Sequence, residues 1–223
     1  MQVKEYSLRE RKHAQTKIAI VNAFVGALEK SRFEDISIRW ICKEVNISEG
    51  TFFNYFSEKL DMINYYTQLL FLKIIWEARQ VAEEDKFPGF IEAVFTKLAD
   101  EHKNANIIYK MISVLLLQQE KPKELVVPAI ERKMLFPDYP GIEDIPLAFP
   151  DEFFRSYLEK MYKKGLLPAD VKVNDLKVSL NAIMIGTLLA LKFDDLDNKK
   201  YHYLRQLRLL WQGLGIKNTT RRK

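Results

Sequence analysis

Residues 37–59, SIRWICKEVNISEGTFFNYFSEK, concentrate side chains that can recognise another molecule through hydrogen bonds. Ser48 stands where it can cap a short helix, and the free N–H groups in the first turn of that helix can face a phosphate. Gly50 permits a close backbone approach. Polar groups are predicted to project outward from Thr51, Asn54 and Tyr55. These residue types and their spacing indicate noncovalent recognition.

Enzymatic and metal chemistry find little support in the sequence. HExxH, GxSxG and P-loop patterns are missing, and His13, His102 and His202 lie far apart along the chain, although distant residues can meet in a fold. The aspartates of residues 194–197 lack the glycine and distal glutamate of an EF-hand, and capping a helix is the simpler role. We therefore expect no catalytic residue, no bound metal and no cofactor.

The residues that could do this chemistry are positioned by a predicted helix-turn-helix. Ser37 is placed as the N-cap of a short helix over residues 38–45, residues 46–48 form the turn, and a second short helix follows Ser48. Asn46 suits the left-handed conformation that ends the first helix. Many three-helix packs have this spacing without binding DNA, so the spacing alone does not establish a DNA-binding protein.

Composition places the chain among globular proteins. It has 223 residues, of which 48% are hydrophobic and 29% charged, and its formal net charge of +5 suits an anionic partner without identifying one. A single cysteine, Cys42, allows no internal disulfide and is interpreted as core, so we expect a cytoplasmic protein. The longest apolar run, residues 178–193, is shorter than the roughly 20 residues of a spanning helix.

Helical periodicity covers almost the whole chain, and the sequence predicts an all-α protein of about nine or ten helices. The expected helices are residues 16–31, 38–45, a short segment after 48, 57–78, 88–102, 104–119, 122–135, 151–164, 174–193 and 197–214. Asp151 is the expected cap of its helix, Gly165 the expected stop, and residues 136–150 an extended loop. Basic residues before the first helix form either an arm for the DNA backbone or a solvated terminus: Lys4, Arg9, Arg11, Lys12 and Lys17.

The sequence resembles the TetR family of one-component transcriptional regulators over residues 11–66. The resemblance includes a helix ending in the aromatic Phe33, the Ser-capped helix at residues 38–45, and the run at residues 47–56 with Lys59. It implies an N-terminal helix-turn-helix DNA-binding domain, residues 1–59, and a larger C-terminal ligand-binding and dimerisation domain, residues 60–223. The C-terminal part carries no comparable motif.

By position, the resemblance implies two sets of DNA contacts. The phosphate-binding set is Ser37, Arg39, Ser48, Thr51, Tyr55 and Lys59. The set facing base edges in the major groove is Glu49, Gly50, Phe53 and Asn54. Asn54 could pair with adenine, Glu49 could accept from cytosine, and Phe53 could pack on a thymine methyl. The alternative role for Glu49 is a partner of the helix dipole, and the alternative for Phe53 is a core residue.

Two of these positions depart from the family pattern. Phe53 stands where the family usually has tyrosine, so one hydroxyl contact to DNA is missing, and Tyr55 stands where histidine is common. The missing hydroxyl keeps open an alternative function, a helical protein–protein adaptor with a degenerate helix-turn-helix.

In the family, the last two long helices form a four-helix interface between two copies. Here this implies a homodimer through Leu180, Ile183, Met184, Thr187, Leu188, Leu207, Leu210 and Trp211, with a plain core as the alternative. The middle helices are rich in large apolar residues, which suit a lipophilic effector. Candidate effector residues are Trp76, Phe95, Tyr109, Met134 and Tyr157. The function implied is a repressor that binds a pseudo-palindromic double-stranded DNA operator and is released by a small effector.

Overall fold

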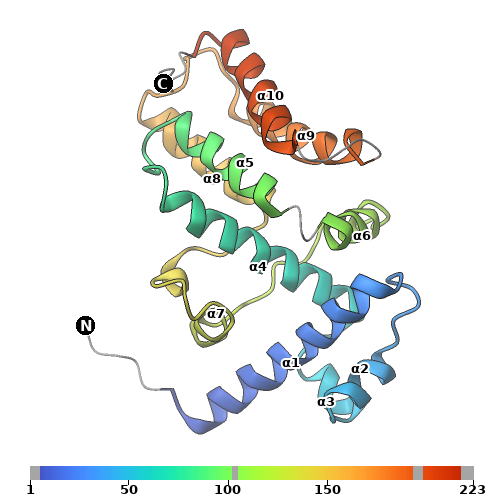
Figure 1. Cartoon of the computed structure of the whole chain (residues 1–223). Coiled ribbons are helices and arrows are strands. Elements are labelled where there is room, and N and C mark those ends of the chain that lie inside the picture. The colour runs from blue at the N-terminus through green and yellow to red at the C-terminus, as the bar shows by residue number, and fades with distance from the viewer. Residues whose placement is uncertain (1–5, 102–104, 193–197, 217–223) are drawn as a thin grey trace. The chain divides into compact units, whose positions relative to one another are not determined.

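The computed structural model describes residues 6–101, 105–192 and 198–216, and within these ranges it contains ten α-helices and no strand. The all-α prediction is confirmed (Figure 1). The helices are α1 (Leu8–Lys30), α2 (Ile38–Glu44), α3 (Glu49–Phe53), α4 (Lys59–Arg79), α5 (Gly89–Asp100), α6 (Ala105–Leu116), α7 (Ala129–Leu135), α8 (Pro150–Lys163), α9 (Val173–Ala190) and α10 (Lys199–Gly213). A short 3-10 turn, η2, spans Ile142–Asp144.

The helices fall into two compact units. The boundaries of these units differ from the ranges expected from the sequence, residues 1–59 and 60–223. Unit 1 comprises Met1–Leu70 and Asn106–Leu147, and unit 2 comprises Phe71–Ala105 and Ala148–Lys223. Helix α4 therefore contributes its first half to unit 1 and its second half to unit 2. The helix-turn-helix shares its compact unit with α6 and α7, which the motif alone does not indicate.

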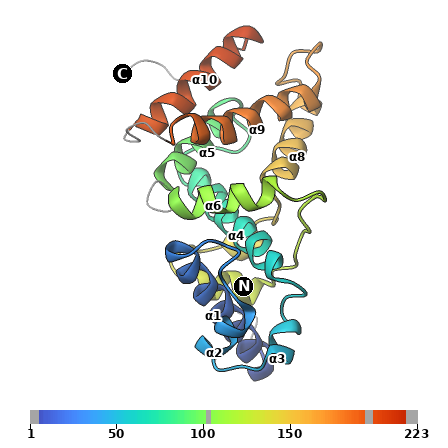
Figure 2. The same ribbon diagram turned by 90° about the vertical axis from the view of Figure 1, so that its right-hand side faces the viewer.

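Unit 1 has one apolar core that gathers residues from α1 to α4, α6 and the segment before α7. Phe24, Ile41, Phe52 and Phe56 are fully or almost fully buried in it. Cys42 lies in the same core, and burial raises the pKa of its thiol, which agrees with the predicted packing role. Figure 2 shows α2 and α3 following α1 at one end of this unit. This core holds the short helices α2 and α3, which are too short to be stable alone.

Unit 2 is built on aromatic packing among α4, α5, α8 and α10. Phe71 contacts Phe153 and Phe154 edge-on, and Phe95 stacks on Phe154 with centroids 5.9 Å apart. Trp211 is completely buried and meets Phe87 at 5.2 Å. Helices α8 and α9 pack together, as do α9 and α10.

Three helix boundaries differ from the sequence prediction. Helix α1 begins at Leu8 rather than near residue 16, because Ser7 and Glu10 form a capping box. Asp151 lies inside the first turn of α8, whose N-cap is Phe149. Helix α7 begins at Ala129 rather than 122, since buried side chains bind the preceding backbone: Gln68 Oε1 accepts from Leu125 N at 3.0 Å.

Other expectations are confirmed or lie beyond the described residues. Gly165 has a φ of 70° and follows the last turn of α8, as a helix stop requires. Among the described residues, α9 alone is long and apolar enough to cross a membrane, a test that core helices of soluble proteins also pass. Outside the described residues lie Lys4, His102, Asn104, and Phe193 with the aspartates of 194–197.

Candidate nucleic-acid interface

The helix-turn-helix has the caps and the turn that the sequence predicts. The Ser37 hydroxyl accepts from Trp40 N at 3.1 Å to begin α2, and the Ser48 hydroxyl accepts from Thr51 N at 3.0 Å to begin α3. Between them Asn46 has a φ of 54°, in the left-handed region that asparagine tolerates. Local side-chain chemistry therefore fixes the angle at which α3 follows α2.

The two hydroxyls at the start of α3 also engage each other. Ser48 Oγ and Thr51 Oγ1 are 2.9 Å apart and share one hydrogen bond. Each hydroxyl carries one proton, so one of the two O–H groups stays able to donate to an outside acceptor. This pair can hold a phosphate oxygen while it caps the helix.

Helix α3 presents an outward face. Phe53 is 51% exposed, whereas Phe52 beside it is completely buried, and the two rings meet edge to face at 5.4 Å. The core alternative for Phe53 is therefore wrong. Glu49, Gly50 and Asn54 are exposed as well. A Cβ added at Gly50 would meet only Ser48 Oγ, at an ordinary 3.8 Å, so the packing of the protein itself does not require glycine there.

Helix α2 adds two exposed side chains at its start. Arg39 is exposed, as a phosphate-binding residue must be. Trp40 is 45% exposed, and the sequence analysis did not single it out. The sequence could have predicted this exposure, because Trp40 follows the N-cap Ser37 by three residues and precedes the buried pair Ile41 and Cys42.

Tyr55 does not point freely outward. Its ring is half-buried and lies against the His13 ring of α1, with centroids 4.6 Å apart. Tyr55 also lines a shallow groove of about 600 Å³ together with residues of the first turns of α1: Leu8, Arg9, Lys12, His13 and Thr16. The end of the helix-turn-helix and the beginning of α1 thus form one surface.

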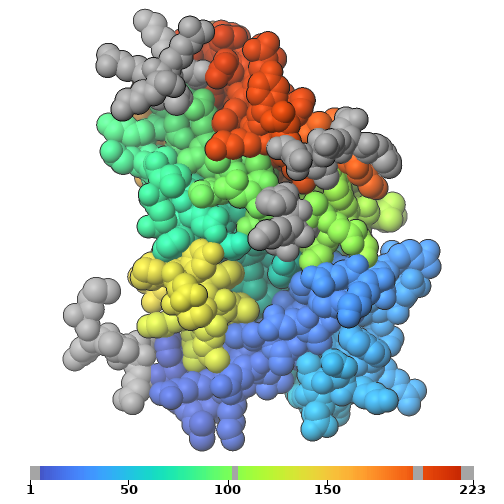
Figure 3. Space-filling model, viewed as in Figure 1, coloured from blue at the N-terminus to red at the C-terminus, as the bar shows by residue number. Residues whose placement is uncertain are grey.

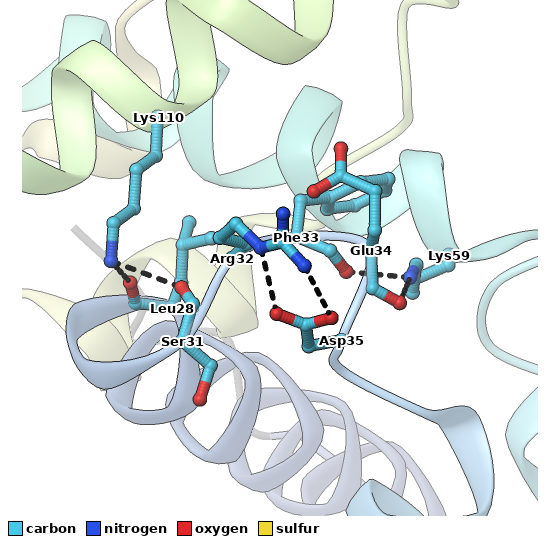
Figure 4. A network of polar contacts seen from close by, with 8 residues as sticks. All are labelled: Leu28, Ser31, Arg32, Phe33, Glu34, Asp35, Lys59 and Lys110. Carbon is cyan, nitrogen blue, oxygen red and sulfur yellow. Dashed lines mark hydrogen bonds and ion pairs between the residues drawn. The ribbon is translucent and has the colours of Figure 1, made fainter.

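Lys59 differs from its expected role as a phosphate ligand. Its ammonium donates to the carbonyl oxygens of Phe33 at 2.6 Å and Ile36 at 2.9 Å, and lies 4.2 Å from the centre of the Phe33 ring. A third carbonyl, that of Glu34, is at 3.5 Å (Figure 4). Burial lowers the pKa of Lys59, while the carboxylates of Glu34 and Asp35 favour its charged form. With its three donors directed at these carbonyls, Lys59 ties the start of α4 to the α1–α2 loop.

A second lysine holds the other end of the same loop. Lys110 of α6 donates to the carbonyl oxygens of Leu28 at 2.6 Å, Ser31 at 3.0 Å and Glu29 at 3.1 Å. These carbonyls belong to the last turn of α1 and its C-cap, where the helix dipole favours a cation. Within the loop, Arg32 and Asp35 form a bidentate pair with distances of 2.9 and 3.1 Å (Figure 4). Neither lysine contact was predicted, because sequence spacing does not show which side chain meets a helix end.

Most of the predicted dimer residues are core residues of unit 2. Leu180, Leu207 and Trp211 are completely buried, and Thr187 and Leu188 are nearly so, which corrects their assignment to an interface. Only Ile183, Met184 and Leu210 are partly exposed. Helical periodicity identifies an apolar face but not what covers it, and here the same chain covers it.

The predicted effector residues do not belong to one unit. Trp76, Phe95 and Tyr157 lie in unit 2, whereas Tyr109 and Met134 lie in unit 1. Tyr157 is buried between Phe90 and Phe153, and burial, with the charges of Glu84 and Asp85, raises the pKa of its phenol. Among the described residues, the Tyr157 hydroxyl and the Trp211 indole N–H are buried without a hydrogen-bond partner.

Neither a protein-family model nor a curated protein matches this sequence. Solved structures do match its fold. FadR of Thermus thermophilus, a TetR family transcriptional repressor in complex with lauroyl-CoA, is 17% identical, with a TM-score of 0.61 over 93% of this chain and 99% of its own. A protein of Shewanella sp. PV-4 assigned to the TetR family of transcription regulators is 13% identical (TM-score 0.55; 89% and 97% covered). Salmonella enterica GusR is 17% identical (TM-score 0.54; 90% and 96% covered).

Proposed function

From the TetR-like fold of this chain, we propose that the protein is a sequence-specific DNA-binding transcriptional regulator that acts as a repressor. The observation that carries the proposal is the outward face of α3. A bulky apolar ring and an amide stand exposed next to a buried phenylalanine, on a helix whose two caps are formed. An exposed, rigidly held face of this kind suits the edges of bases in a major groove.

The contacts divide into two kinds. Ser37, Arg39, Ser48, Thr51 and Tyr55 hold phosphates and set the position of the protein on the duplex. Glu49, Gly50, Phe53 and Asn54 face the bases, where Asn54 pairs with an adenine and Phe53 covers a thymine methyl. Lys59 contributes indirectly, by fixing the loop that precedes α2.

Two copies bind an inverted repeat, and their contact is formed by the outer face of α9 and α10. On α9, Val178, Ala182, Gly186 and Leu189 follow one another at spacings of three and four residues, and all are exposed. The small residues permit close helix approach. On α10, Tyr201 and Leu209 are more than half exposed. These residues replace the buried set of the sequence prediction, and the partly exposed Ile183, Met184 and Leu210 lie at its margin.

The dimer is tested by placing a charge in this face. Leu189→Glu should convert the dimer into a monomer in sedimentation equilibrium and abolish binding to a two-half-site duplex. Leu117→Glu is the matched control, because Leu117 is also exposed but lies in unit 1. A monomeric wild-type protein, or a Leu189→Glu variant that stays dimeric, contradicts this interface.

A lipophilic effector binds among the aromatic residues of unit 2 and releases the protein from DNA. The buried hydroxyl of Tyr157 and the N–H of Trp211 support this, because a ligand with one polar group would give them the hydrogen bonds that the described side chains do not. The coupling is reciprocal: DNA weakens effector binding as much as the effector weakens DNA binding. Lipophilic compounds, lauroyl-CoA included, should be screened for loss of duplex binding. Tyr157→Phe removes one hydrogen bond to the effector and should weaken the response about tenfold.

Selection of duplexes from a random library by the purified protein tests the proposed function. Enrichment of an inverted repeat is the expected result. Binding without an enriched sequence contradicts it and favours the protein–protein adaptor.

A further inference from the structure

The first turns of α1 form a basic groove beside the helix-turn-helix. Arg9, Lys12, His13 and Thr16 are spaced three and four residues apart and lie on one face of the helix, and Leu8 extends that face. Tyr55 forms the opposite wall through its ring contact with His13. In Figures 1 and 3 the first turns of α1 lie on the same edge of unit 1 as α3.

The cationic groups of this groove are available for an outside partner. Within the described residues, no hydrogen bond or ion pair engages the side chain of Arg9 or Lys12, and both are exposed. Two neighbours have other tasks: Arg11 Nε donates to Tyr6 O at 2.9 Å, and the ammonium of the buried Lys17 pairs with Glu131 at 3.2 Å. Glu10, the acidic residue of this turn, is bound to Ser7 in the capping box.

The position of α1 is set from within unit 1. Ser7 caps it, Ala14 and Lys17 are buried on its inner face, and Lys110 holds its last turn. Arg9 and Lys12 are therefore carried on an ordered helix that begins at Leu8, and not on a frayed terminus. An ordered helix places two cations at a fixed distance from Tyr55, one residue beyond Asn54.

We propose that Arg9 and Lys12 bind backbone phosphates of the duplex that α3 reads, so that the DNA interface extends from Tyr55 onto the first turns of α1. This proposal rests on the proposed function in one respect, namely that the bound molecule is a DNA duplex read by α3. Charge complementarity selects the DNA backbone as occupant, and continuity with Tyr55 places it beside the major-groove contacts. Leu8, His13 and Tyr55 line the same groove as the two cations.

The test uses the full-length protein and a short duplex of arbitrary sequence, with affinity measured over a range of salt concentrations. In B-DNA each phosphate contact contributes about 0.9 to the slope of log affinity against log salt. The double variant Arg9→Ala/Lys12→Ala should lower the slope by about 1.8 per subunit and weaken binding about eightfold per contact at 0.1 M salt. Arg9→Lys/Lys12→Arg, which keeps both charges, should retain the wild-type slope.

The control Lys30→Ala/Lys163→Ala removes the same charge at two exposed positions, in the last turns of α1 and α8. It should leave the slope almost unchanged. An unchanged slope for the Arg9/Lys12 double variant overturns the proposal, as does an equal fall for the control. The salt-dependence experiment uses an arbitrary duplex and needs no operator. If duplex selection enriches no inverted repeat, the sequence-specific regulator is refuted, while the salt slopes of the variants still decide whether Arg9 and Lys12 bind phosphates. Failure of the wild-type protein to bind any duplex overturns both.

Discussion

The ammonium of Lys59 lies 2.6 Å from the carbonyl oxygen of Phe33, so the first residue of α4 is bound to the loop between α1 and α2. At the other end of that loop, the ammonium of Lys110 donates a hydrogen bond to the carbonyl oxygen of Ser31 at 3.0 Å. The two ammonium groups bind carbonyls at the end of α1 and in the loop that follows it. Both contacts therefore restrict the motion of the α1–α2 loop within unit 1.

Removing one of these ties should destabilise unit 1. Lys110→Met keeps the side-chain length but loses three hydrogen bonds to the end of α1, and we expect unfolding in urea to become easier by about 1.5 to 3 kcal/mol. Lys30→Met, at an exposed position of the same helix, should change the free energy of unfolding by about 0.5 kcal/mol or less. Equal effects of the two substitutions would show that Lys110 is an ordinary surface lysine.

Phe52 and Phe53 should separate stability from DNA binding. Phe52→Ala empties a fully buried site and should cost about 3 to 5 kcal/mol of folding free energy. Phe53→Ala removes an exposed ring and should cost about 0.5 kcal/mol, while it weakens binding to an operator that has a thymine at this position. Thermal unfolding and duplex binding of both variants provide the measurement. A Phe53→Ala variant with full operator affinity would remove Phe53 from the interface.

Gly50 should be needed for DNA and not for folding. Since a Cβ there meets only Ser48 Oγ at 3.8 Å, Gly50→Ala should stabilise the protein by up to about 1 kcal/mol through helix propensity. The same methyl should obstruct the close approach of α3 to the bases and weaken duplex binding. Gly26→Ala is the matched control: nothing lies within 4 Å of its added Cβ, so it should stabilise the protein and leave binding unchanged.

Acid should weaken unit 2 through Asp85. Its carboxylate accepts from Lys164 at 2.8 Å and from Lys160 at 3.0 Å, and these hydrogen bonds hold the pKa of Asp85 below its usual value. Because the folded state has the lower pKa, the unfolded state binds more protons. The stabilisation is therefore complete above the unfolded-state pKa of about 3.9 and is lost as pH falls through the lowered folded value.

Asp85→Asn should reduce the fall in unfolding free energy at low pH, measured from unfolding curves recorded between about pH 6 and pH 2. High salt should reduce the same fall in part, because it screens the charges. Asp138→Asn is the control, since Asp138 is exposed and no hydrogen bond or ion pair engages its side chain within the described residues. A fall that Asp85→Asn leaves unchanged would contradict the assignment.

The sequence predicted helix caps and turns, but it did not predict which helix faces pack against each other. Ser37, Ser48 and Asn46 were predicted correctly, because caps and left-handed turns depend on a few neighbouring residues. Leu207 and Trp211 were assigned to a dimer interface with a plain core as the alternative, and they are core residues; an apolar helix face has the same pattern whether it meets its own chain or a partner.

Two further features depended on different kinds of signal. The start of α1 was recoverable from the Ser7–Glu10 capping box. The tie from Lys59 to Phe33 joins residues 26 positions apart, and no local pattern identifies it.

Duplex selection with the wild-type protein and Asn54→Ala side by side shows whether α3 reads a DNA sequence. The wild-type protein should enrich an inverted repeat whose half-sites lie about 10 base pairs, or a multiple, apart. Asn54→Ala should lose about 1 to 3 kcal/mol of discrimination at one base pair of each half-site, with an unchanged salt dependence. Asn174→Ala, at an exposed position of α9, should match the wild type. The absence of any enriched sequence, or identical enrichment by Asn54→Ala, would show that α3 does not read the bases through Asn54.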